Sequence, residues 1–142
     1  MTKFIYATDK YDPARESVVK NVIRIVSTII ELPKHIEVEF RPLAAHVYGE
    51  TLLDARFKNR IRLHENLSPR EVILPLVHEL LHLNQSYLGK LQGRRDGSFL
   101  WDNKVYHVSK KPTIVEWANL PWEIDVAEKE QALYEKVINS HS

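Results

Sequence analysis

The sequence predicts a single α+β domain in which a small mixed sheet is combined with three main helices. Apolar residues recur at helical spacing near both ends and in the middle of the chain. Between the first two helical stretches, apolar and polar residues alternate as they do in half-buried strands. A chain of 142 residues has the usual size of one domain and can bury one core without disulfides, so we treat residues 1–142 as one domain.

The first helix is expected from Pro13 to about Glu31. Asp12 is a suitable N-cap, and proline is favoured at the first helical position because it needs no backbone N–H there. Leu32-Pro33 should end the helix. Four β-branched residues at helical spacing are expected to face the core: Val18, Val22, Ile25 and Ile29.

Three short β-type stretches follow, at His35 to Phe40, His46 to Leu52, and Asn59 to His64. In the first stretch, Ile36 and Val38 alternate with glutamates, which is typical of a strand with one buried face. These stretches are expected to form the sheet.

A second helix is expected to begin at Ser68-Pro69-Arg70-Glu71, which has the form of a capping box with proline at the first helical position. Pro75 should bend this helix or leave one carbonyl without its usual partner. One apolar stripe is expected to be buried: Val72, Leu76, Leu80 and Leu83.

The C-terminal part begins with a polar, glycine-containing segment at 89–112. Within it, residues 99–101 and 105–108 could pair as a hairpin around Asp102-Asn103-Lys104. A last helix is expected from about Pro121 to Asn139. Its core-facing residues should be Ala127, Leu133, Tyr134, Val137 and Ile138.

The composition limits the classes of partner. Twenty basic and nineteen acidic side chains give a net charge of +1, which provides no overall field for nucleic acid. Lys90, Arg94 and Arg95 form a local basic cluster that we interpret as a solvated loop in preference to a phosphate-binding patch. No apolar run is long enough for a membrane anchor, and the N-terminus lacks a secretory apolar region. A cytoplasmic monomer is therefore expected.

The run His78-Glu79-Leu80-Leu81-His82 carries the functional information of this sequence. On a helix, residues four apart are neighbours, so both imidazoles can reach one metal ion at about 2.0–2.1 Å. Glu79 flanks the metal and can accept a proton from a water molecule that the metal activates. The plain alternative is a helix that buries two histidines against its core. Because the chain has no cysteine, every metal ligand must come from His, Asp or Glu.

A catalytic zinc ion needs a third protein ligand and an open position for water. Leu88 stands where the metzincin pattern would place a third histidine, which leaves a later helix as the common source. The start of the C-terminal helix offers Glu123 as the first choice and Asp125 as the second, since only one of them can face the metal squarely. Both acids could instead complement the helix dipole.

Several features together resemble one family of enzymes. The His78 to His82 motif, Gln85, the segment from Trp101 to Lys104 and the Pro121-Trp122-Glu123 element are similar to small single-domain gluzincin-type zinc metallopeptidases, often found in phages and prophages. The resemblance covers roughly residues 45–135.

The resemblance implies a zincin-like minimal catalytic domain with one zinc ion held by His78, His82 and Glu123. It also implies a peptide or protein substrate, endopeptidase activity, and the host cytoplasm as location if a phage encodes the chain. Larger gluzincins often carry an acid at the position of Ala127 to orient a ligand histidine, so the source of that support stays open here.

Glu79 is expected to act as general base, and Gly49 to let an edge strand at His46 to Leu52 approach extended substrate. Four side chains are candidates for contacts with substrate or the transition state: Tyr106, His107, Tyr87 and Arg94. The main alternative is a catalytically silent zincin-fold binding or regulatory domain with a bound metal. A metallohydrolase of another amide or ester bond is a third possibility.

Overall fold

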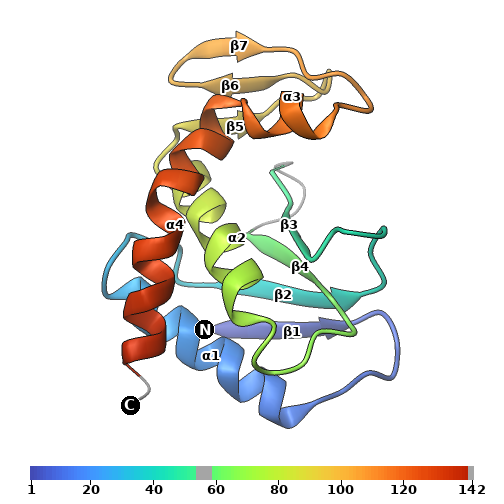
Figure 1. Cartoon of the computed structure of the whole chain (residues 1–142), viewed down its shortest axis with the longest axis vertical. Helices are drawn as coiled ribbons and strands as arrows, with labels where there is room; N and C mark the ends of the chain where they lie inside the picture. Colours follow the sequence, from blue (N-terminus) through green and yellow to red (C-terminus); the bar gives the residue numbers. More distant parts are fainter. Residues whose placement is uncertain (54–58, 141–142) are drawn as a thin grey trace.

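The computed structural model describes residues 1–53 and 59–140, and these residues form a mixed α+β arrangement with two sheets (Figure 1). The strands are β1 (Thr2–Tyr6), β2 (Ile36–Arg41), β3 (Gly49–Thr51), β4 (Arg60–His64), β5 (Leu91–Gly93), β6 (Phe99–Trp101) and β7 (Lys104–Tyr106). The helices are α1 (Pro13–Ser27), α2 (Ile73–Tyr87), α3 (Ile114–Ala118) and α4 (Pro121–Asn139). The predicted α+β class is confirmed.

The larger sheet has the strand order β1-β2-β4-β3, in which β1, β2 and β4 are parallel and β3 pairs antiparallel to β4 at the edge. The prediction of a mixed sheet is therefore confirmed, although β1 was not expected. Phe4 and Tyr6 on β1 point to the same face and stack on Phe40 with ring centroids 6.2 and 5.5 Å apart. This alternation is the sequence signal that could have revealed the strand.

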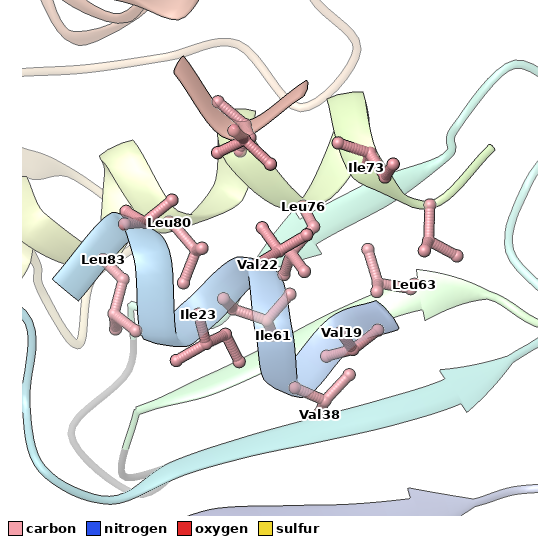
Figure 2. Close-up of a cluster of buried hydrophobic side chains, with 14 of the residues drawn as sticks. Val19, Val22, Ile23, Val38, Ile61, Leu63, Ile73, Leu76, Leu80 and Leu83 are labelled. Carbon is pink, nitrogen blue, oxygen red and sulfur yellow. The ribbon is translucent and has the colours of Figure 1, made fainter. Parts of the chain in front are cut away.

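The core lies between one face of this sheet and the helices α1 and α2, with α4 packed on α2. Figure 2 shows Val22 and Ile23 of α1 next to Ile61 of β4, with Leu76 of α2 above them. The opposite face of the sheet is charged: Arg60 pairs with Glu37 at 2.8 Å. As predicted, one stripe of α2 and the residue before it are buried: Val72, Leu76, Leu80 and Leu83.

Helix α1 ends at Ser27, four residues before the predicted end. At this end of the helix, the hydroxyl groups of Ser27 and Thr28 donate to the backbone carbonyls of Arg24 and Ile25 at 2.7 and 2.6 Å. Such local bonds compete with continued helix. Ile29 is consequently outside the helix and 41% exposed, so its predicted place in the core is wrong.

The predicted capping box forms, but α2 begins only at Ile73. The backbone N–H of Ser68 donates to the Glu71 carboxylate at 3.0 Å, and the Glu71 N–H donates to the Ser68 hydroxyl at 3.2 Å. This turn is separate from the helix because Pro75 has no N–H to bond to the carbonyl of Glu71. Pro75 thus lies in the first turn of α2, where it is tolerated, and not at the predicted interior position.

Strand β3 is shorter than the predicted stretch from His46 to Leu52. His46 has a φ of 69°, which an extended strand cannot contain, and the N–H of Val47 closes a turn on the carbonyl of Ala44 at 3.0 Å. Within this stretch only residues 49–51 form a strand, which lies at one edge of the sheet.

The predicted hairpin forms as β6 and β7, joined by Asp102 and Asn103, whose φ values of 47° and 67° suit a tight two-residue turn. Strand β5, which pairs with β6, and the short helix α3 were not expected. Figure 1 shows this small sheet and α3 together at one end of the molecule, beyond β3.

Helix α4 has the predicted bounds. Its buried face, however, carries Val126 in place of Ala127, which is exposed, and Ile138 is 39% exposed. The core-facing residues therefore run one position earlier than predicted along the first part of the helix. Neither this longest helix nor any other in the described part of the chain is long and apolar enough to cross a membrane.

Candidate metal centre and its cleft

His78 and His82 lie one turn apart on α2, and their rings are 4.9 Å apart between centroids. Glu123, in the first turn of α4, reaches both of them because α2 and α4 pack side by side (Figure 1). Its carboxylate oxygens lie 3.3 Å from His78 Nε2 and 2.9 Å from His82 Nε2. Three side chains from two helices thus converge on one point.

These three side chains fit a zinc ion. Each offers one ligand atom, and the three atoms lie within 4.8 Å of one another. Two ligands at about 2.05 Å from a tetrahedral zinc ion would stand about 3.4 Å apart, close to the distances found here. Two imidazoles and one carboxylate are also a known donor set of catalytic zinc, which leaves a fourth position for water.

Each histidine is oriented through its other ring nitrogen. His78 Nδ1 lies 3.0 Å from the Glu130 carboxylate, and His82 Nδ1 lies 2.8 Å from Oε1 of Gln85. A carboxylate only accepts, so the neutral ring of His78 can donate from Nδ1 to Glu130 and present Nε2 to a metal. Glu130 lies two helical turns after Glu123. It thereby orients a ligand histidine, a role for which the sequence offers no acid at Ala127.

Gln85 has its amide orientation fixed by two further bonds. Its Nε2 group donates to the Trp122 carbonyl at 3.0 Å and to the Asp125 carboxylate at 2.8 Å, so Oε1 accepts from His82. Asp125, the second choice as ligand, is therefore used to hold Gln85 and also pairs with Lys129 at 2.8 Å. Among the described residues, the group able to hold a metal contains Glu123 and not Asp125.

Glu79 lies beside the two histidines and is only 6% exposed. The Thr51 hydroxyl donates to its carboxylate at 2.9 Å and lies 3.1 Å from its backbone carbonyl. Gly49 lies close to this side chain, since a Cβ on Gly49 would lie 3.1 Å from Glu79 Cγ, and a larger residue would displace the Glu79 side chain slightly. Burial raises the pKa of Glu79, and the nearby His82, His78 and Thr51 only partly oppose this effect.

The charges of the centre are strongly coupled in the metal-free protein. For His78, burial opposes protonation, but the bond to Glu123 and the charges of three glutamates prevail and raise its pKa to about 9. The pKa of His82 is raised for similar reasons, against its burial. Burial alone would raise the pKa of Glu123, yet the two histidines lower it to about 2. A proton on His78 therefore competes with a cation for this centre at neutral pH.

The centre lies on the floor of a cleft of about 970 Å³. One wall consists of β3 with Leu52 and Leu53, and the other consists of residues 93–95 and 97–99 with Trp117 of α3. The floor is formed by α2 and the start of α4, through His78, Glu79, His82, Trp122 and Glu123. A polypeptide segment in this cleft would pass directly over Glu79 and the histidines.

Of the four side chains predicted to contact substrate, Arg94 lines this cleft and the other three do not. Tyr87 follows His78 by nine residues, which places it about 180° around the helix, and it is 54% exposed. The Tyr106 ring packs edge-on against Trp122 at 5.8 Å. His107 lies just after β7, where its charge helps to lower the pKa of Asp96.

The sequence did not indicate the roles of three residues around the centre, Glu130, Gln85 and Thr51, or the position of Arg95 in the cleft lining. Glu130 could have been found, because it lies seven residues after Glu123 and hence on the same face of a helix. Thr51 could not, because its position depends on how β3 packs against α2.

The chain was also compared with known proteins. No protein-family model, no curated protein and no solved structure matches it.

Proposed function

We propose that this chain is a zinc-dependent metallopeptidase with a zincin-like catalytic domain. The observation that carries the proposal is the convergence of His78, His82 and Glu123 beside the buried carboxylate of Glu79. A structural zinc site would need four protein ligands and no neighbouring base. Three ligands, an adjacent carboxylate and an open cleft instead suit hydrolysis.

The metal would be held by Nε2 of the two histidines and a carboxylate oxygen of Glu123. When bound, a zinc ion would activate water as a nucleophile and polarise the scissile carbonyl. Glu130 and Gln85 keep the two imidazoles in the tautomer that presents Nε2 to the cleft. Glu123 neutralises part of the positive charge of the centre.

Glu79 would act as the general base. Its carboxylate accepts the proton of the attacking water and passes it to the departing amine, so that the peptide bond breaks without free hydroxide or amide ions. Burial raises its pKa towards the range in which a carboxylate can both accept and release a proton. The hydrogen bond from Thr51 fixes the orientation of this carboxylate.

The substrate is proposed to be a peptide or protein cleaved within its chain. Strand β3 is an edge strand of the larger sheet and lines the cleft, so an extended peptide could add to it as a further strand. Gly49 keeps that edge close to Glu79.

The test compares the parent protein with Glu79→Gln and, as a matched control, with Glu31→Gln, which changes an exposed acid. All three should bind one zinc ion, measured by metal analysis after gel filtration. Loss of the base should lower peptide hydrolysis by about 10²- to 10⁴-fold in Glu79→Gln only. Equal activity of parent and Glu79→Gln would reject Glu79 as base. Zinc binding without cleavage of any peptide in a random library would favour a silent binding domain.

A further inference from the structure

Arg94 and Arg95 stand at the cleft without a partner of their own among the described residues. Both follow β5 and line the same cleft as Glu79 and the histidines. No side-chain hydrogen bond or ion pair joins either guanidinium group to the described part of the chain, although the charge of Arg94 contributes to lowering the pKa of Asp96. Two adjacent cations that line a cleft, neither of them hydrogen-bonded to a carboxylate of the described residues, indicate an anionic ligand group.

The turn that carries these arginines is well fixed. The Arg94 N–H donates to the Ser98 carbonyl at 2.9 Å, and the Gly97 N–H donates to the Arg94 carbonyl at 3.0 Å. Gly97 has a φ of 87°, a conformation that glycine adopts without strain. The Asp96 carboxylate accepts from the N–H and hydroxyl of Ser98 at 2.9 and 2.6 Å, so this acid serves the turn.

The two walls of the cleft touch next to the arginines. A Cβ on Gly93 would lie 3.1 Å from the carbonyl oxygen of Leu53, so a larger residue would require the two backbones to move apart by a few tenths of an ångström. The contact fixes the position of Arg94 and Arg95 relative to β3 and to the floor of the cleft. The backbone contact between the two walls therefore helps to hold both arginines at the cleft.

The carboxylates that line the cleft are already engaged. Glu50 on the opposite wall lies 3.3 Å from Arg62, Glu79 accepts from Thr51, and Glu123 contacts the two histidines. None of the described lining acids is therefore left to neutralise the arginines. A carboxylate of the bound substrate would fill this role.

An apolar surface lies next to the two arginines. Phe99 packs on Trp122 at 5.2 Å between ring centroids, and both line the cleft together with Trp117, which is 48% exposed. Aromatic surface of this kind binds bulky apolar side chains. The cleft thus offers an aromatic surface and a cationic pair within one substrate path.

We propose that the cleft selects polypeptides in which a bulky apolar residue stands close to a carboxylate, with Arg94 and Arg95 binding the carboxylate and Phe99, Trp117 and Trp122 the apolar side chain. This substrate class rests on the proposed peptidase function. The carboxylate is that of an acidic side chain or of the peptide C-terminus, which offer the same chemistry. A C-terminal carboxylate would make the enzyme prefer chain ends.

The test measures binding separately from hydrolysis. Zinc-loaded Glu79→Gln protein is titrated with four fluorescent peptides that share one aromatic residue and differ only in the nearby group: internal Glu, internal Gln, C-terminal acid or C-terminal amide. In one of the two pairs, Glu against Gln or C-terminal acid against amide, we expect the acidic peptide to bind about tenfold more tightly than the neutral one. This difference should shrink at high salt. Adding Arg94→Ala and Arg95→Ala together should abolish this difference. The pair Lys110→Ala and Lys111→Ala, exposed and outside the cleft lining, should leave it unchanged.

Equal affinity for acid and neutral peptides, or a difference that survives the double arginine substitution, would overturn the inference. The inference would also be overturned if the protein bound DNA at low salt, lost this binding on substitution of Arg94 and Arg95, and bound acidic and neutral peptides equally. The two arginines would then bind nucleic acid. Hydrolysis by the parent without discrimination would leave the peptidase proposal intact. Discrimination without hydrolysis would reject the peptidase proposal and retain the carboxylate site.

Discussion

The two ends of the molecule are held together in different ways. The end with α1 and the larger sheet surrounds a continuous apolar core in which Val38, Phe40 and Leu63 have no exposed surface. At the other end, α3 has no buried residue, and Ile114 and Val115 are 88% and 69% exposed. The candidate centre lies between them, with its metal-facing residues on the core helices α2 and α4. Stability is therefore expected to come from the first end and ligand contact from the second.

The largest expected effect is on the free energy of unfolding. Leu76→Ala should lower it by about 2–5 kcal/mol, because Leu76 is fully buried and its removal leaves a cavity in the core. Val115→Ala in α3 should change it by less than about 0.5 kcal/mol, since Val115 is mostly exposed. Urea unfolding followed by circular dichroism measures both values. Similar decreases in the free energy of unfolding in the two variants would show that α3 belongs to the cooperative core and would contradict the difference between the two ends.

The same contrast explains how much of the fold the sequence could predict. The core end follows simple periods: Leu76 and Leu80 repeat at helical spacing, and Ile36 and Val38 alternate as in a strand. Strand β1, strand β5 and helix α3 were missed because they have five residues or fewer. In β1 the alternation of Phe4 and Tyr6 spans only two apolar positions, and β5 and α3 depend on contacts with neighbouring segments for their position.

The residues of the candidate site also differ in how well the sequence could predict them. His78, Glu79 and His82 share one helical turn, so their neighbourhood is a local property that the motif states directly. Glu123 was predicted from its place at the start of a later helix, and the structure brings it within reach of both histidines. Arg95 was assigned to a solvated loop, because its position in the cleft depends on the contact between the two walls.

The next effect concerns zinc affinity, because the residues that face the metal lie on the core helices α2 and α4. Glu130→Ala removes the carboxylate that orients His78 and should weaken zinc binding by about 10- to 100-fold. Glu128→Ala on the same helix, which removes an exposed acid, should leave the affinity unchanged, as should Val115→Ala at the other end. Competition with a chelator of known affinity measures all three. Equal affinity of Glu130→Ala and Glu128→Ala would mean that the packing of α2 alone orients the ring.

The effect that is smallest for a single step is the pH dependence of that affinity, about tenfold per pH unit for one histidine. A metal ligand must be a neutral imidazole, so a proton on His78 competes with zinc. Because the pKa of His78 is raised to about 9, its proton stabilises the metal-free form at any pH below about 9. Zinc affinity should therefore rise as the pH increases towards about 9 and level off above it.

Titration calorimetry in two buffers of different ionisation enthalpy counts the protons released when zinc binds. At pH 8 the parent should release close to one proton from His78, with a further contribution from His82, whose pKa is also raised. Glu130→Ala loses one of the charges that raise the pKa of His78, so its affinity should level off at a lower pH. Constant affinity between pH 7 and 9 would show that His78 is already neutral, and the acids of α4 would then have little influence on the metal centre.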